Sequence, residues 1–159
     1  SSSDLRVAIG FEAWLEETLI PEALGTDAKY AVRAATCCCR AEVNLLLPSY
    51  RIIRRRIAWL VGKWVEEDLQ PATLEKIYSL LIHLLGRNAS TDTAIRLTAA
   101  RSLAKCGDTW DFDSTVFVPF LPAAIEEIVS LLGEVTLPDS QMRLNQTLGV
   151  VIDRVQGAV

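Results

Sequence analysis

One short pattern occurs three times along the sequence and constrains its fold more than any other feature. In each copy an apolar residue precedes an arginine, and small or apolar residues follow one to two helical turns later. The copies begin at Ile53-Arg54, Ile95-Arg96 and Met142-Arg143. The first two start 42 residues apart, and the second and third start 47 apart. This spacing is the length of a pair of helices with its connecting loops, so it predicts a chain built from repeated helix pairs.

A period of about 40–47 residues is typical of HEAT and armadillo repeats, in which each repeat is a helix pair. Stacked pairs form a curved solenoid, and such solenoids present extended surfaces to other proteins. The chain has 159 residues, of which 50% are hydrophobic, enough for about three pairs around a continuous core. We therefore predict an all-α, HEAT-repeat (armadillo-like) α-solenoid that binds partners rather than catalysing a reaction.

Helical spacing of the apolar residues places the three pairs. We expect them at about residues 4–66, 71–106 and 115–156, with residues 1–3 as a flexible leader or remnant. The first pair is interrupted by a predicted insertion at 25–49, which Pro48 is expected to end. Neither end carries a polar cap, so residues 4–159 are predicted to be a segment of a longer solenoid.

The clearest helix is expected over residues 50–66. Its predicted core stripe, about 100° wide, consists of Ile53, Ile57, Leu60, Val61 and Trp64. The opposite, exposed face is predicted to carry Arg51, Arg55, Ala58 and Gly62. On that face Gly62 is expected to mark the close approach of a neighbouring backbone.

The arginine of each repeated pattern borders the apolar face of its helix. Arg54, Arg96 and Arg143 are therefore predicted to form a structural ladder, one per pair, that bonds loop carbonyls or an aspartate of a neighbouring pair. The planar, five-donor guanidinium group suits that role.

A second set of side chains is a candidate partner-binding site. Arg51, Arg55, Trp59 and Lys63 are expected to project from the second helix of the first pair into the concave groove. The indole ring of Trp59 adds a stacking surface beside the cations. Two interpretations stay open with equal weight: a strip that binds acidic residues of another protein, and a solvated charged face.

Catalytic and metal sites are not indicated. The one histidine, His83, lies within an apolar stripe, and no phosphate-binding loop or nucleophile with a nearby base is present. The loop 108–113 contains three aspartates but lacks the glycine and terminal glutamate of a calcium-binding EF-hand loop. Cys37, Cys38 and Cys39 are consecutive and Cys106 is distant, so no disulfide framework is expected. We predict no enzyme activity, no cofactor and no metal.

Charge and hydropathy limit the classes of partner. The net charge of −4 argues against a dedicated nucleic-acid-binding protein. No apolar stretch reaches 18 residues without a charge, so no transmembrane helix is expected. We predict a monomer that binds neither nucleic acid nor membranes.

Residues 50–65 resemble the middle HEAT repeats of the importin-beta superfamily of nuclear transport receptors, most closely the importin eleven subgroup. Trp14-Leu15, Ile95-Arg96 and Phe120-Leu121-Pro122 extend the resemblance over most of residues 4–155. The apolar, cysteine-rich stretch 25–49 departs from the family pattern.

The resemblance implies a receptor that shuttles between cytoplasm and nucleus and carries protein cargo through the nuclear pore under control of the GTPase Ran. First helices, at residues 73–86 and 115–134, would face Phe-Gly nucleoporins, and second helices would face cargo or Ran. This would place Arg51, Arg55, Trp59 and Lys63 on the cargo- or Ran-binding side. One alternative remains a HEAT scaffold or adaptor subunit unrelated to nuclear transport, and a nucleic-acid-binding HEAT module is the weakest alternative.

Overall fold

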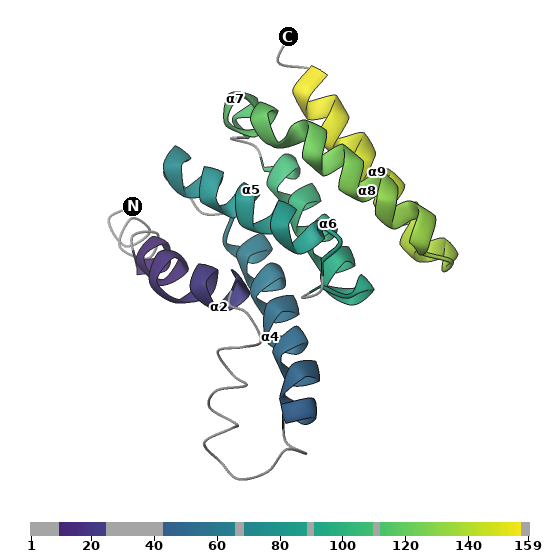
Figure 1. The fold of residues 1–159 in the computed structure, drawn as a ribbon. Helices are drawn as coiled ribbons and strands as arrows, with labels where there is room; N and C mark the ends of the chain where they lie inside the picture. Colours follow the sequence, from purple (N-terminus) through teal and green to yellow (C-terminus); the bar gives the residue numbers. More distant parts are fainter. Residues whose placement is uncertain (1–9, 25–42, 66–68, 89–90, 110–111, 157–159) are drawn as a thin grey trace.

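A computed structural model describes residues 10–24, 43–65, 69–88, 91–109 and 112–156 (Figure 1). Within these ranges the chain contains helices and turns and no strand, so the all-α prediction is confirmed. The predicted leader 1–3 and most of the predicted insertion, including Cys37–Cys39, lie outside the described residues.

Three helix pairs follow one another along the chain. In the first pair, a helix from Gly10 passes through a π-helical turn, η1 (Leu15–Leu19), into α2 (Ile20–Leu24), and α4 (Val43–Trp64) is the second helix. The second pair consists of α5 (Pro71–Leu85) and α6 (Thr93–Asp108). In the third pair α7 (Ser114–Phe117), the 3-10 turn η2 (Val118–Phe120) and α8 (Leu121–Glu134) precede α9 (Pro138–Gln156).

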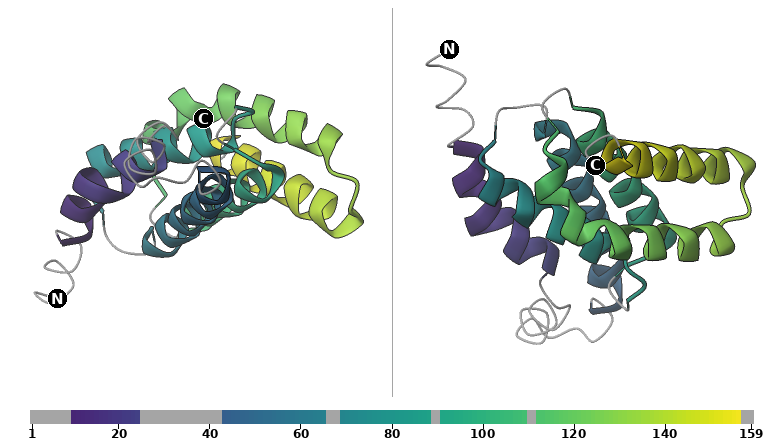
Figure 2. Two further views of the ribbon diagram at one scale, coloured as in Figure 1. Left: turned by 60° about the horizontal axis from the view of Figure 1, so that its bottom comes forward. Right: turned by 90° about the horizontal axis from the view of Figure 1, so that it is seen from above.

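The helices form two layers. The second helices of the pairs lie side by side, α6 packing against α4 on one side and α9 on the other. The first helices form the other layer, in which α5 contacts both α2 and α8 (Figure 2). This is the arrangement expected when each pair buries its apolar faces against the next pair.

The core lies between the two layers. Its largest members with almost no exposure include Tyr78, Phe117, Leu15, Ile77, Leu81, Leu84, Ile95, Leu103, Ile128 and Leu131. Aromatic pairs join elements within it: the rings of Phe11 and Trp64 stack at 4.7 Å, and Tyr78 meets Phe117 edge to face at 5.0 Å. Such pairs add about 0.5–1.5 kcal/mol each beyond their area burial.

Local chemistry explains where several helices begin and end. Pro71 occupies the first turn of α5, where its missing N–H is not needed. The Asp92 carboxylate caps α6 by accepting a 2.9 Å hydrogen bond from the Ile95 N–H. Pro119 and Pro122 lie where the predicted helix 115–134 is divided into α7, η2 and α8.

The second helix of the first pair differs from its prediction at its start. It begins at Val43 rather than Tyr50, so Pro48 lies inside α4 and does not end an insertion. Residues 43–49, assigned to the insertion, therefore belong to the repeat. The preceding helical segment runs on to Leu24.

The buried face of α4 also differs from the prediction. Ile53 is 43% exposed, whereas Ala58 and Gly62, predicted to be exposed, are buried. The reason is that α4 packs against α6 as well as against the first layer. The side facing α6 carries the small residues, because only they let the two backbones approach.

One helical stretch among the described residues, Ser114–Glu134, is long and apolar enough by length and composition to cross a membrane. It is not one continuous α-helix, and it contains Glu126 and Glu127. Ala124, Ile128 and Leu131 on this stretch are buried in the core. The burial of these residues between the two helix layers explains in part why this stretch is so apolar.

Candidate partner-binding surface

The repeated arginines do not share one environment. Arg54 is 1% exposed, and its Nε donates a 3.2 Å hydrogen bond to the carbonyl oxygen of Ala23, near the end of α2. Arg96 is 2% exposed, and its Nε donates a 2.7 Å hydrogen bond to the carbonyl oxygen of Leu85, the last residue of α5. Each thus satisfies a carbonyl at the C-terminal end of the preceding helix, where such groups lack intrahelical partners.

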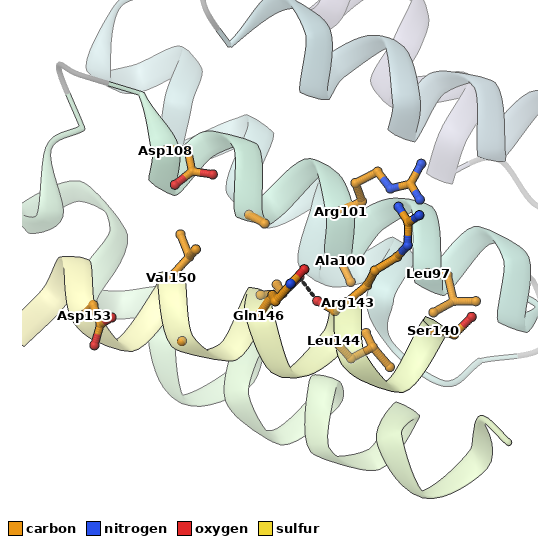
Figure 3. Close-up of a pocket in the computed structure, with 13 residues that line it drawn as sticks. Leu97, Ala100, Arg101, Asp108, Ser140, Arg143, Leu144, Gln146, Val150 and Asp153 are labelled. Atoms are coloured by element: carbon orange, nitrogen blue, oxygen red, sulfur yellow. Dashed lines mark hydrogen bonds between the residues drawn. The ribbon is translucent and has the colours of Figure 1, made fainter. Parts of the chain in front are cut away.

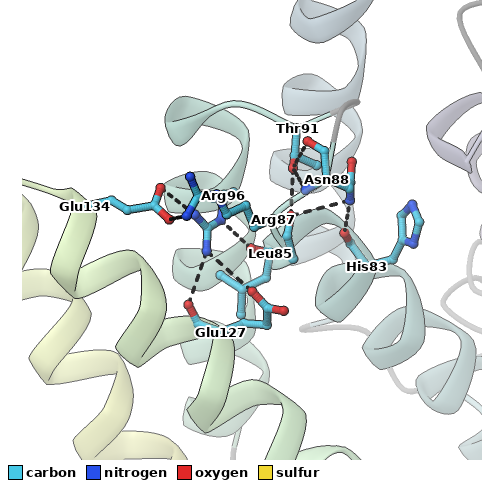
Figure 4. A network of polar contacts seen from close by, with 9 residues as sticks. His83, Leu85, Arg87, Asn88, Thr91, Arg96, Glu127 and Glu134 are labelled. Atoms are coloured by element: carbon cyan, nitrogen blue, oxygen red, sulfur yellow. Dashed lines mark hydrogen bonds and ion pairs between the residues drawn. The ribbon is translucent and has the colours of Figure 1, made fainter.

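Arg96 also joins the second pair to the third (Figure 4). Its two terminal nitrogens lie 2.8 Å from a carboxylate oxygen of Glu134 and 3.4 Å from one of Glu127, both on α8. The guanidinium group is desolvated, while the two carboxylates keep about 30% of their side-chain exposure. Arg87 adds a second, exposed cation 3.4 Å from Glu134.

Arg143 lies on the surface, contrary to its predicted place in the ladder. The buried positions of α9 are Leu144, Thr147 and Val151, which repeat the spacing of the buried positions that follow Arg54 and Arg96. Leu144 therefore occupies the position held by arginine in the other two pairs. A shift of one residue rotates a side chain by about 100° around a helix, which turns Arg143 outward.

Residues of α4 and α6 together line a basic cleft of about 720 Å³. Its lining contains five cationic residues and no carboxylate: Arg55, Arg56, Lys63, Arg101 and Lys105. Trp59 lines the same cleft with 47% of its surface exposed. The Nε of Arg55 donates a 3.3 Å hydrogen bond across the cleft to the Thr98 hydroxyl, which orients that guanidinium group.

The structure brings together three of the four predicted site residues. Arg55, Trp59 and Lys63 line the basic cleft, whereas Arg51 is exposed but lies outside its lining. Sequence reasoning missed the contributions of α6. The repeat offset of 42 residues was a usable signal, because it relates Lys63 to Lys105 and Trp59 to Arg101.

A second cleft, also of about 720 Å³, lies between α6 and α9 (Figure 3). Its charges are divided between two ends. Arg101 and Arg143 both point toward one end of the cleft. Asp108 and Asp153 lie toward the other end, where α6 and α9 approach their C-termini.

Among the described residues, the titratable groups outside the two clefts form no recognisable reaction centre. Burial raises the pKa of the Cys106 thiol to about 12, which keeps it protonated and unreactive at neutral pH. Asp113 caps α7, and hydrogen bonds from Thr115 hold the pKa of its carboxyl below the ordinary value. His83 is exposed on α5. No cluster of three or more histidine, cysteine, aspartate or glutamate side chains suited to a metal ion occurs in the described ranges.

Comparisons with known proteins agree with this architecture. Importin-11 of Homo sapiens and of Mus musculus are each 26% identical over 152 residues, which is 93% of this chain and 13% of theirs. The importin beta-like protein KAP120 of Saccharomyces cerevisiae is 24% identical over 153 residues, 96% of this chain and 13% of its own length. No protein-family model matches the chain.

Among solved structures, Lph2, described as a bidirectional nuclear transport receptor of S. cerevisiae, superposes with a TM-score of 0.73. The match covers 94% of this chain and 13% of Lph2, at 21% sequence identity. The likeness confirms the predicted α-solenoid of HEAT repeats. The chain spans about 13% of the length of the relatives it matches. Together, the sequence relatives confirm the predicted resemblance of this chain to importin-beta family transport receptors, and the structural likeness confirms the fold.

Proposed function

We propose that the chain is a non-enzymatic, protein-binding segment of a nuclear import receptor. The receptor would carry protein cargo through the nuclear pore and release it under control of the GTPase Ran. It would therefore shuttle between the cytoplasm and the nucleus. The likeness to importin-11 and its yeast relatives supports a transport receptor, and the charge distribution of the described residues supports the binding surface assigned below.

The basic cleft between α4 and α6 is the observation that carries the proposal. A chain of net charge −4 collects five cations in one cleft whose lining holds no carboxylate. Their mutual repulsion is relieved when an anionic partner enters, and the guanidinium groups of Arg55 and Arg56 are suited to bidentate binding of carboxylates. We assign this cleft to an acidic segment of the cargo or of Ran.

Trp59 gives the cleft a second kind of contact. Its indole is large, rigid and half exposed, and such rings dominate the energy of many protein interfaces. An apolar or aromatic residue beside the acidic ones would pack on this ring. The expected partner motif is therefore acidic with an apolar anchor.

The layer of first helices is assigned to nucleoporin binding on the basis of the family resemblance. First helices α5 and α8 would face Phe-Gly repeats of nucleoporins, as predicted for residues 73–86 and 115–134. Val118 and Val129 on this layer are 47% and 54% exposed, which offers apolar contacts for such repeats.

A pull-down of the full-length protein that carries this sequence tests the function. Cell extract is applied with and without Ran locked in its GTP-bound state. We expect captured proteins that Ran-GTP displaces, and these would be the cargo. If Ran-GTP neither binds nor displaces any protein, the transport mechanism is wrong, and a HEAT scaffold or adaptor outside nuclear transport becomes the better account.

A charge-neutralised variant tests the cleft itself. Arg55→Gln combined with Lys63→Gln should leave the melting temperature unchanged, because both side chains are exposed, and should weaken capture about fivefold or more. Arg87→Gln is the control, since it removes an exposed cation that lies after α5 and outside the cleft. Equal capture by the double variant and the control would show that partners bind elsewhere.

A further inference from the structure

We propose that the cleft between α6 and α9 binds a short peptide segment with an acidic residue at one end and a basic residue at the other. The inference rests on the proposed function in that the occupant belongs to a protein partner. It adds a second site, next to the basic cleft, and specifies the charge pattern that this site selects.

The cationic end of the cleft is set up for a carboxylate. Arg101 and Arg143 come from different repeats, and both side chains point toward this end of the cleft (Figure 3). Within the part of the chain that the structure describes, neither forms an ion pair. Two guanidinium groups that line one end of a cleft repel each other, and a carboxylate bound there offsets that repulsion with charge-assisted hydrogen bonds.

The other end carries the opposite charge. Asp108, the last residue of α6, and Asp153, near the end of α9, are both exposed and line the same cleft. They also lie at helix C-termini, where the partial negative charge of the helix dipole adds to that of the carboxylates. A lysine or arginine of the occupant is therefore favoured here.

The lining between the two ends carries no charge. Ala104 and Gly149 contribute small or no side chains, Val150 is apolar, and Gln146 is polar. The small residues let the main chain of an occupant approach, and Val150 can contact a short apolar side chain. The middle of the occupant is therefore expected to be uncharged.

The length of the cleft fixes the spacing of the charges. Arg101 and Asp108 are separated by seven residues along α6, about 10 Å at roughly 1.5 Å per residue. Arg143 and Asp153 are separated by ten residues along α9, or about 15 Å. An extended peptide advances about 3.3 Å per residue, so three or four positions separate its charged ends.

The two clefts thus differ in charge pattern while sharing one residue. Arg101 lines both. The α4–α6 cleft has cations throughout and favours a uniformly acidic segment, whereas the α6–α9 cleft favours a bipolar one. Substitutions of Arg143 and Asp153 affect only the second cleft, and substitutions of Arg55 and Lys63 affect only the first.

Fluorescent peptides measure this selectivity directly in the full-length protein that carries the sequence. The bipolar probe has two glutamates, an Ala-Leu-Ala spacer and two lysines, and the comparison probe replaces both lysines with glutamate. Fluorescence anisotropy should give saturable binding of the bipolar probe. Arg143→Glu and Asp153→Lys should each raise its Kd about tenfold, because each turns an attraction into a repulsion.

Control variants separate this inference from the proposed function. Arg55→Gln with Lys63→Gln should leave the Kd of the bipolar probe within about twofold, while weakening the all-acidic probe. Unchanged melting temperatures would show that the variants are folded.

Any of three results would overturn the inference. The first is the absence of saturable binding of the bipolar probe up to about 1 mM, and the second is equal binding of both probes to the Arg55→Gln, Lys63→Gln variant. The third result is an unchanged Kd of the bipolar probe in the Asp153→Lys variant. None of them bears on whether Ran-GTP displaces cargo, so the proposed function would stand or fall separately.

Discussion

Arg54 and Arg96 are almost fully buried, and each places its charge where the preceding helix leaves carbonyl oxygens unpaired. Burying a guanidinium group is costly unless its donors are satisfied. The side chain of Arg96 meets this condition through one carbonyl and two carboxylates. No buried side-chain nitrogen or oxygen among the described residues lacks a partner. Whether the buried polar groups of the core have hydrogen-bond partners therefore depends on individual side chains such as Arg96.

Replacing Arg96 with alanine tests its structural role. The variant loses the hydrogen bond to Leu85 and both ion pairs, and it leaves a cavity between α6 and α8. Because Glu127 and Glu134 can still reach water, we expect a loss of about 3 kcal/mol, at the lower end for a buried pair. For a chain of this size that is a fall in melting temperature of roughly 6–12 °C, measurable by circular dichroism.

Arg143→Ala is the matched control. The same substitution at the third copy of the pattern removes an exposed side chain, so its effect should stay within about 0.5 kcal/mol. Equal melting temperatures for the two variants would contradict the structural role of Arg96.

The sequence shows why one arginine was misplaced. Periodicity identifies a helix face to within one residue on either side, and Arg143 and Leu144 differ by one position. Which of them enters the core depends on how α9 is rotated against α6, a tertiary property that no local pattern encodes. Ile53, expected in the core and found exposed, has the same explanation.

Close packing of α4 on α6 depends on the small residues Ala58 and Gly62 of α4, which face Ser102 of α6. The Ser102 hydroxyl donates a 2.7 Å hydrogen bond to the carbonyl oxygen of Ala58. A Cβ added at Gly62 would lie 2.4 Å from the Ser102 Oγ and 2.9 Å from its Cα. Since the obstructing atoms include backbone, a rotamer change cannot relieve the overlap, and the two helices must separate.

Gly62→Ala and Gly149→Ala should therefore have opposite effects. Alanine is the better helix former by about 1 kcal/mol, so Gly149→Ala, whose Cβ would meet nothing within 4 Å, should stabilise the fold by up to that amount. At Gly62 the same gain is opposed by an overpacking cost of about 1–3 kcal/mol, and we expect net destabilisation. Urea unfolding of both variants checks the sign of each change, and stabilisation by Gly62→Ala would disprove the close contact.

Helix ends could be predicted where local chemistry sets them, and could not where the chain continues without a break. Pro71 and Asp92 are such chemical signals, since Pro71 occupies the first turn of α5 and Asp92 caps α6. Pro48 is an equally strong signal but lies within α4, where the helix continues through it. The lining of the α4–α6 cleft was predicted only for α4. Arg55, Trp59 and Lys63 can be identified from the pattern of that one helix, whereas the residues of α6 join them only when the pairs stack.

Across the molecule, each helix pair is held in place mainly by contacts within the pair and with the pairs next to it in the sequence. Main contacts of α9 are with α6, α7 and α8, and those of α2 are with η1, α4 and α5. Stability in such a stack is approximately a sum of terms for each repeat and for each interface between neighbours. Arg96 lies at one interface, where it links α6 to α8. Weakening that interface should loosen the third pair without disturbing the first.

Hydrogen exchange measured by mass spectrometry can resolve this difference along the chain. Glu127→Gln combined with Glu134→Gln keeps the shape of both side chains but removes the charges that compensate the buried Arg96 guanidinium group. We expect amides of α8 and α9 to exchange about tenfold faster or more, with those of η1 and α2 unchanged. Glu126→Gln is the control, because this exposed neighbour on α8 has no part in the network. Acceleration of equal size in all three pairs would mean that the chain opens as one cooperative unit, and that the charges on α8 do not act at a local interface.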